Sequence, residues 1–131
     1  MTIERVVPRI TEIQNVRSAY SSYSTRITGT MPDFVHIREW PILIGGMFDE
    51  TDVQQRAKVA VVGTTVARYL FGGRDPVGQT ITIRANLPLR IIGVLASKGE
   101  QTTGEDMDEI VLIPATTYEA FLGMPTGYHE L

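Results

Sequence analysis

The clearest pattern of hydrophobic and polar positions lies in the middle of the chain. It begins with the apolar, largely β-branched run VAVV at 59–62, which is typical of a strand covered on both faces. Gly63 permits a sharp exit from that strand, and we expect Thr64 or Thr65 to cap a following helix. The pattern therefore predicts a strand-to-helix unit at this point of the chain.

The predicted helix has one apolar stripe and a clear end. Val66, Tyr69 and Leu70 are spaced as i, i+3 and i+4, which places them on one face of a helix. The glycine pair at 72–73 is expected to end the helix, and the proline of the DPVG turn at 75–78 prevents its resumption.

Two strands are predicted after this turn. Residues 80–84 alternate isoleucine with polar residues, which indicates a strand buried on one face. A turn is expected at 86–88, and a mostly apolar strand at 89–95. Gly93 lies inside this second strand and predicts a bulge or a close approach of another backbone segment.

The remaining patterns predict short elements and one polar loop. In chain order, we expect a hairpin turning near Ser21–Ser22, a strand at Phe34–Ile37, a turn at Gly45–Gly46, a helix from Asp49 to Arg56, a strand at Ile110–Ile113 and a helix from Ala115 to Leu122. Asp49 or Thr51 is the expected cap of the 49–56 helix. The polar, glycine-containing stretch 98–109 has little to bury, so we expect a mobile loop there.

Several of these segments, taken in order, resemble a known family. The runs AVVGTTVARYLFGGRDPVGQTITI, RIIGVL and DEIVLIP closely resemble the periplasmic core domain of MacB-type ABC transporter permeases. The resemblance extends upstream to GTMPDFVHIREWPILIGGMF and so covers Ile27 to Gly123. One departure is Gly46, which stands where the family usually has the arginine of a Gly-Arg pair, so any ion pair of that arginine is absent.

The resemblance implies an α+β fold, a mixed sheet with short helices, divided into lobes. It implies that 1–30 is a strand-rich, partial segment of the membrane-proximal lobe, that 31–123 is the outer lobe, and that 124–131 is a tail. The returning segment of the inner lobe is expected to be missing from this chain. The membrane helices and the ATPase of such a permease are expected outside these residues.

The function that the resemblance implies is export without catalysis by this domain. The chain is expected to lie on the periplasmic or extracellular side of the bacterial inner membrane, as part of an integral membrane protein. It would transmit conformational change and dock a periplasmic adaptor protein, within a dimeric parent permease. No cofactor is expected in these residues, and contact with the membrane is expected only through transmembrane helices elsewhere.

The composition of the chain argues against several classes of function and of site. The 131 residues carry a net charge of −3 with scattered basic residues, which argues against nucleic-acid binding. The absence of cysteine excludes disulfides, cysteine-based zinc sites and a thiol nucleophile. No apolar run reaches the roughly 18 residues of a membrane span, and the N-terminus lacks the apolar core of a signal peptide.

The residues that could form a catalytic, cofactor or metal site are better explained by ordinary structural roles. The turn at Gly63 lacks the further glycines of a dinucleotide site. Isolated His36 and His129 do not suggest a metal centre, and no serine lies in a nucleophile elbow. Four carboxylates are clustered at Glu105, Asp106, Asp108 and Glu109. A solvated loop is favoured for them over a cation site or over a small enzyme acting through paired acids.

Docking residues are proposed on the polar turns. We expect the loop 98–109 and the turn 72–78 to form the docking face, with Gln101, Thr102, Glu105, Asp106, Asp108, Arg74 and Asp75 as its candidate residues. Exposed tyrosines suit protein interfaces, and we expect partial exposure of Tyr20, Tyr23 and Tyr118.

The alternative function is a stand-alone module that binds a small molecule or a peptide. Such a module would need an apolar groove, for which the candidate lining is Trp40, Met47, Phe48, Tyr69 and Phe71. A plain core role for these side chains is favoured over the groove.

Overall fold

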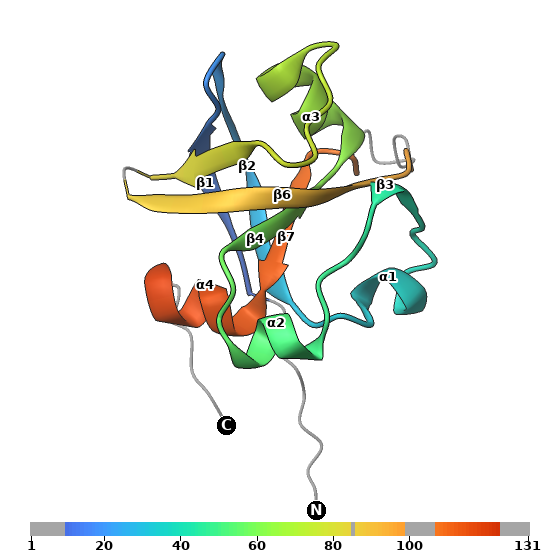
Figure 1. The fold of residues 1–131 in the computed structure, drawn as a ribbon, viewed down its shortest axis with the longest axis vertical. Helices are drawn as coiled ribbons and strands as arrows, with labels where there is room; N and C mark the ends of the chain where they lie inside the picture. The colour runs from blue at the N-terminus through green and yellow to red at the C-terminus, as the bar shows by residue number, and fades with distance from the viewer. Residues whose placement is uncertain (1–9, 85, 99–106, 124–131) are drawn as a thin grey trace, which may run out of the picture.

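The computed structural model describes residues 10–84, 86–98 and 107–123 (Figure 1). Its elements, in chain order, are β1 (Ile10–Arg17), β2 (Ser22–Thr30), α1 (Phe34–Ile37), β3 (Ile42–Gly45), α2 (Glu50–Gln54), β4 (Val59–Val62), α3 (Thr64–Phe71), β5 (Thr80–Ile83), β6 (Leu87–Leu95), β7 (Ile110–Pro114) and α4 (Ala115–Phe121). The predicted α+β class, a mixed sheet with short helices, is confirmed.

The strands form a sheet that closes on itself. Their order is β3-β6-β4-β7-β2-β1-β5, and β5 also pairs with β6. The circuit β6-β4-β7-β2-β1-β5 therefore has no free edge, and β3 extends it beside the C-terminal half of β6. The β2–β7 and β4–β6 pairs are parallel, whereas the others are antiparallel. In Figure 1, β5 and β6 cross in front of the other strands of the circuit.

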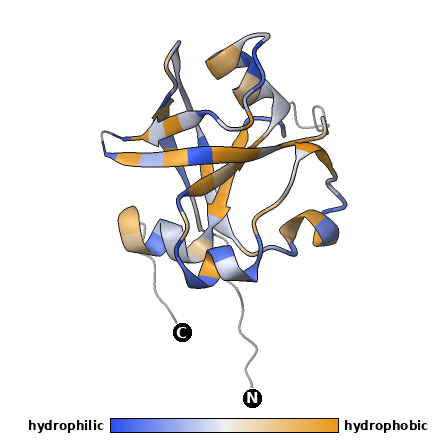
Figure 2. Ribbon diagram, in the orientation of Figure 1, coloured by the Kyte–Doolittle hydropathy of each residue, from blue (hydrophilic) through white to orange (hydrophobic). Residues whose placement is uncertain are grey.

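The alternation of side chains in β4 and β7 produces two cores. Ala60 and Val62 face the inside of the circuit, together with Val111 and Ile113. The intervening Val61 and Leu112 pack outside it, in a second cluster with residues of α1, α2 and the Trp40 segment. The prediction that 59–62 is covered on both faces is confirmed, and both strands are largely hydrophobic in Figure 2.

Helices α3 and α4 cover opposite ends of the closed sheet (Figure 1). Leu70 and Phe71 of α3 and Tyr118 of α4 belong to the inner core, and each is at most 1% exposed. The start of β1 lies at the α4 end, and the β1–β2 turn lies at the α3 end. The predicted boundary between a segment 1–30 and a lobe 31–123 separates strands of one sheet. Strand β1 pairs with β5, and β2 pairs with β7, across this boundary. The predicted tail at 124–131 lies outside the described residues.

Most predicted turns and helices are confirmed. The first hairpin turns at 18–21, where the amide of Ser18 donates to the carbonyl of Ser21. Helix α2 begins after Asp49, which forms a reciprocal capping box with Asp52, so Asp49 rather than Thr51 is the cap. Gly93 is a point of close approach, as predicted, because a Cβ there would lie 2.3 Å from the backbone oxygen of Gly46.

Three local predictions were wrong. Residues 34–37 form a helical turn, α1, rather than a strand, because Phe34 and Val35 are both buried in one cluster, and a strand would place them on opposite faces. The turn expected at 86–88 falls earlier, since β6 already begins at the buried Leu87. The cap of α3 is Gly63 and not a threonine.

The cap position has a steric reason to be glycine. A Cβ on Gly63 would lie 2.2 Å from the backbone oxygen of Asp108, so the chain leading to β7 packs directly against this residue. Threonine side chains one and two residues later are already inside the helix and do not cap it.

Candidate functional site

The α3 end of the molecule is built from two segments far apart in the chain. The β1–β2 turn at 18–21 lies beside the C-terminal half of α3, as Figure 1 shows at the top. The hydroxyl of Ser18 donates to the carbonyl of Leu70 at 2.6 Å, and that of Ser21 donates to the carbonyl of Tyr69 at 2.9 Å. These carbonyls belong to the last turn of the helix, where no further backbone amide of the helix reaches them. The hairpin therefore supplies caps to α3.

Aromatic rings cover this end, which we call the tip: the described residues 17–23 and 64–78. The ring of Tyr23 stacks on that of Tyr69, with centroids 4.2 Å apart and planes 9° from parallel. Tyr20 meets the buried ring of Phe71 edge-on at 6.2 Å. Tyr20 is 50% exposed and Tyr69 is 55% exposed, so half of each residue's surface faces solvent. The predicted exposure of Tyr20 is confirmed.

Hydrogen bonds and a cation hold these rings in place. The guanidinium of Arg74 lies 3.8 Å from the ring centre of Tyr20, close enough for a cation–π interaction. It also donates to the carbonyl of Phe71 at 3.3 Å. On the other side, the hydroxyl of the half-buried Tyr23 donates to the carboxylate of Glu109 at 2.5 Å. The tip is an ordered aromatic surface.

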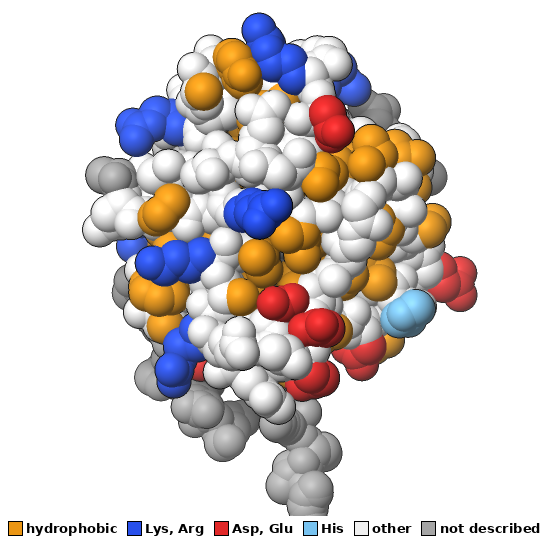
Figure 3. Space-filling model, viewed as in Figure 1, with side chains coloured by type: hydrophobic (Ala, Val, Ile, Leu, Met, Phe, Trp, Pro, Cys, Tyr) orange, Lys and Arg blue, Asp and Glu red, His pale blue; other side chains and the backbone are white. Residues whose placement is uncertain are grey.

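The tip is positively charged. Its residues include Arg17, Arg68, Arg74 and Asp75, which gives three positive charges against one negative, a net of +2 within a chain of net −3. All four residues are exposed, and basic side chains are visible at the top of Figure 3. One carboxylate oxygen of Asp75 accepts the amide of Val77 within its own turn.

The structure brings together only some of the predicted docking residues. Arg74 and Asp75 lie at the tip. Asp108 is 4% exposed, and its carboxylate accepts hydrogen bonds from the Ser97 hydroxyl at 2.9 Å and the Lys98 amide at 2.7 Å, so it holds two segments together below the surface. The other predicted residues, Gln101, Thr102, Glu105 and Asp106, and most of the loop 98–109, lie outside the described residues.

The aromatic residues proposed for a ligand groove mostly fill the cores. Trp40, Phe48 and Phe71 are each 1% exposed, and the indole N–H of Trp40 donates to the carbonyl of Ala96 at 2.7 Å. The favoured core role is therefore confirmed for these three side chains. Tyr69 differs, because it lies on the outer side of α3 at the tip.

The prediction that Tyr118 is partly exposed was wrong. The residue is fully buried at the α4 end, against Gly29, where a Cβ would lie 2.7 Å from the Cβ of Tyr118. Its hydroxyl donates to the carboxylate of Glu12 at 3.0 Å. Burial, and then the hydrogen bond to Glu12, raise the pKa of the Tyr118 hydroxyl well above its usual value.

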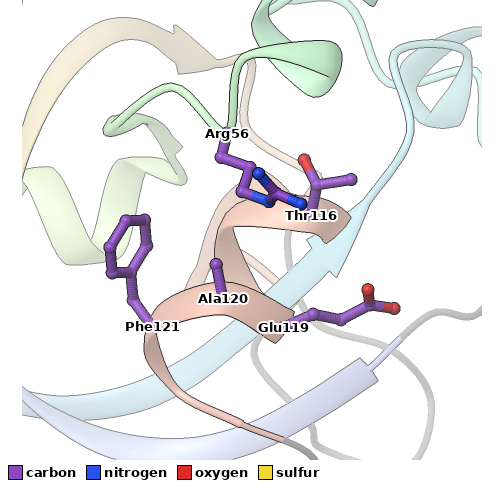
Figure 4. A pocket seen from close by; sticks show the side chains of 5 residues that line it. All are labelled: Arg56, Thr116, Glu119, Ala120 and Phe121. Atoms are coloured by element: carbon purple, nitrogen blue, oxygen red, sulfur yellow. The ribbon is translucent and has the colours of Figure 1, made fainter.

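Two open hollows lie elsewhere on the surface. One, of about 540 Å³, lies between the turn after α2 and the outer side of α4, and Figure 4 shows Arg56, Glu119 and Phe121 around it. The other, of about 520 Å³, lies between α1 and β3 beside the edge of Trp40. Neither joins titratable groups into a catalytic arrangement. The alternative of a stand-alone binding module stays a prediction.

Metal ligation finds little support in the parts of the chain that the structure describes. There, no three His, Asp or Glu side chains come together in a way that could hold a metal ion. His36 is exposed on α1, and His129 lies outside the described residues. Of the acidic cluster, Asp108 and Glu109 are both engaged in hydrogen bonds with neighbouring segments.

The fold is a closed mixed sheet whose two ends are covered by helices, with an ordered aromatic surface at one of these ends. The chain belongs to the MacB-like periplasmic core domain family, whose model matches residues 1–129. The match extends beyond the segment 27–123 that carries the resemblance in the sequence. Within residues 10–84, 86–98 and 107–123, no helix has the length and apolarity to cross a membrane.

Two export ATP-binding/permease proteins are similar to this chain in sequence. The macrolide export ATP-binding/permease protein MacB of Rhodospirillum rubrum is 47% identical over 115 residues, which are 87% of this chain and 17% of that protein. The pyoverdine export ATP-binding/permease protein PvdT of Pseudomonas aeruginosa is 38% identical over 99 residues, or 76% of this chain and 15% of that protein. The chain thus spans less than a fifth of the length of these relatives.

Solved structures share the fold. The periplasmic region of MacB from Actinobacillus actinomycetemcomitans superposes with a TM-score of 0.78 at 19% identity, over 94% of this chain and 53% of that one. The extracellular domain of the noncanonic ABC-type transporter YknZ from Gram-positive bacteria gives a TM-score of 0.76 at 16% identity, over 93% of this chain and 60% of that one.

Proposed function

We propose that this chain is a non-catalytic part of a dimeric export permease, on the periplasmic or outer side of the bacterial inner membrane. Its role is to move as one body, transmit conformational change that ATP hydrolysis drives elsewhere, and dock a periplasmic adaptor protein. The names of the relatives, which are export ATP-binding/permease proteins, support this class of function. The observation that carries the proposal is the closed circuit of strands between the two ends of the domain.

Closure supports motion as one body. In an open sheet the edge strands can splay, but here β5 is hydrogen-bonded on both sides, to β1 and to β6. Each end of the closed sheet is covered by a helix whose buried side chains belong to the same core. A displacement applied at the α4 end is therefore carried to the tip without a hinge in between.

Distance measurements between spin labels test this motion. The chain contains no cysteine, so cysteines can be introduced at the exposed Gln54 of α2 and at the exposed Gly73 of the tip. The label pair is placed in the full-length permease, with any cysteines outside this chain replaced. Distances are then measured by electron–electron double resonance in the nucleotide-free and ATP-bound states.

The expected result separates motion of the domain from motion within it. The distance between Gln54 and Gly73 inside one domain stays the same in both states, while the distance between the two Gly73 labels of the dimer changes. A change in the first distance would show an internal hinge and contradict motion as one body. An unchanged second distance would show that the domain does not follow the nucleotide state.

A further inference from the structure

We infer that the tip is the docking surface of this domain and that its partner presents an acidic protein segment. This inference rests on the proposed docking function and adds to it the surface and the chemistry of the partner. The surface consists of the exposed rings of Tyr20 and Tyr69 with the cations Arg68 and Arg74.

The first argument is that the rings are both exposed and ordered. Tyr69 is stacked on Tyr23, and Tyr20 is held between Phe71 and the guanidinium of Arg74. Aromatic side chains that are already ordered lose little conformational entropy when a partner covers them. Tyrosine and arginine are also the residue types that most often carry the binding energy of protein interfaces.

The second argument is that the backbone beneath the rings is held in place from both sides. The hydroxyls of Ser18 and Ser21 bind the last carbonyls of α3, so the hairpin and the helix keep one relative position. These two hydrogen bonds do not add to the hydrophobic core, because both hydroxyls lie at the surface or near it. Its effect is to fix the spacing of Tyr20 and Tyr69.

The third argument concerns charge. The net charge of the tip is +2 although the chain as a whole carries −3. Arg68 projects from α3 into solvent, and the acidic Glu109 beside the patch is bound to Tyr23. Complementary charge steers association and selects partners, so carboxylates are the groups that this surface would attract.

The position of the tip favours a protein partner over a lipid surface. The first strand begins at the opposite end of the molecule, and α4, the last described helix, also lies there (Figure 1). In the proposed permease the membrane helices lie outside these residues, and a domain joined to them at its α4 end would hold the tip away from the bilayer. The partner is thus a periplasmic protein that reaches the far end of the domain.

Binding of a purified periplasmic adaptor protein to the full-length permease tests the inference. The variant Arg68→Glu with Arg74→Glu reverses two charges at the tip. Its matched control, Arg56→Glu with Arg90→Glu, makes the same change of net charge at two exposed positions that do not belong to the tip. Affinity is measured by biolayer interferometry at low and at physiological salt, after thermal melts show that both variants fold.

A second pair of variants tests the aromatic contribution. Tyr69→Ala removes an exposed ring of the tip, and Phe121→Ala removes a ring that is 44% exposed near the opposite end. We expect each tip variant to weaken adaptor binding about tenfold or more, and the controls to bind like the wild type. The salt dependence of binding should be reduced in the arginine variant.

The outcomes distinguish the inference from the function on which it rests. If the wild-type permease binds the adaptor and the tip variants bind equally well, the tip is not the docking surface, although the docking function stands. If the wild type does not bind, the proposed docking function itself fails. If the tip variants change only the self-association of the permease, the partner is a second copy and the inference of an acidic partner is overturned.

Discussion

Tyr118 links the stability of this domain to pH in a way that one substitution can isolate. Its hydroxyl is fully buried and donates to the carboxylate of Glu12 at 3.0 Å. Tyr118→Phe removes this hydrogen bond and little else. Hydrogen bonds to charged groups contribute about 1.5–3 kcal/mol to stability. The side chain of Glu12 is 30% exposed, so water can replace part of the bond. We therefore expect the free energy of unfolding to fall by about 1.5 kcal/mol at pH 7.

The difference in the free energy of unfolding between the wild type and the Tyr118→Phe variant should become smaller as the pH rises. Burial and the neighbouring carboxylate raise the pKa of Tyr118 in the folded chain, whereas the unfolded residue ionises near pH 10. Above that pH, unfolding of the wild type releases a proton that the folded state retains, which favours the unfolded state. At pH 11 this lowers the free energy of unfolding by about 1.4 kcal/mol relative to the phenylalanine variant, which has no such proton.

Urea unfolding at pH 7, 9 and 11 measures both quantities. Trp40 is a suitable reporter, because it is the only tryptophan of the chain and is 1% exposed. The other tyrosines titrate in both proteins, so the difference between wild type and variant removes most of their effect. A difference that stays constant from pH 7 to pH 11 would refute the reasoning, since it would mean that Tyr118 ionises equally in the folded and unfolded states.

Two further substitutions test close packing and the buried carboxylate. Gly93→Ala should lower the free energy of unfolding by about 3 kcal/mol, because the added Cβ would lie 2.3 Å from a backbone oxygen. Its control is Gly73→Ala, where the added Cβ would have nothing within 4 Å. In the same urea assay this control should change the free energy of unfolding by less than about 0.5 kcal/mol. Asp108→Asn should cost about 1–2 kcal/mol and speed hydrogen exchange of the Lys98 amide, which Asp108 accepts at 2.7 Å; unchanged exchange would argue against this contact.

Local patterns predicted the elements of the middle of the chain well. The strand at 59–62, the helix after Gly63 and the strand from Thr80 follow from periodicity and turn residues that act within a few positions. The close approach at Gly93 could also be predicted, because a glycine inside an apolar strand leaves room that a neighbouring backbone segment can occupy.

Errors arose where a distant segment determines the local structure. The sequence FVHI alternates like a strand, but packing of Phe34 beside Trp40 requires a helical turn. Tyr118 follows a polar threonine pair, and its burial depends on Gly29, nearly ninety positions earlier in the chain. No local pattern signals either contact.

The candidate site was predicted only in part, for the same reason. The sequence predicts Arg74 as a turn residue and Tyr20 as an exposed tyrosine, from two separate local patterns. What joins them is the pairing of β1 with β2 and the binding of serine hydroxyls to carbonyls of α3. The helical spacing predicts Tyr69 on the apolar stripe of α3, but its ring lies over Tyr23 at the surface.

The long β1–β2 ladder gives the domain a mechanical direction. The two strands run lengthwise from the α4 end to the tip, paired residue by residue from Ile10 opposite Gly29 to Arg17 opposite Ser22 (Figure 1). Hydrogen bonds between strands lie across the strand axis. A pull on the tip away from the α4 end therefore acts along both strands and does not draw apart the bonds between them, whereas a sideways pull would open these bonds one after another from the turn. The domain should resist tension along its length far better than tension across it.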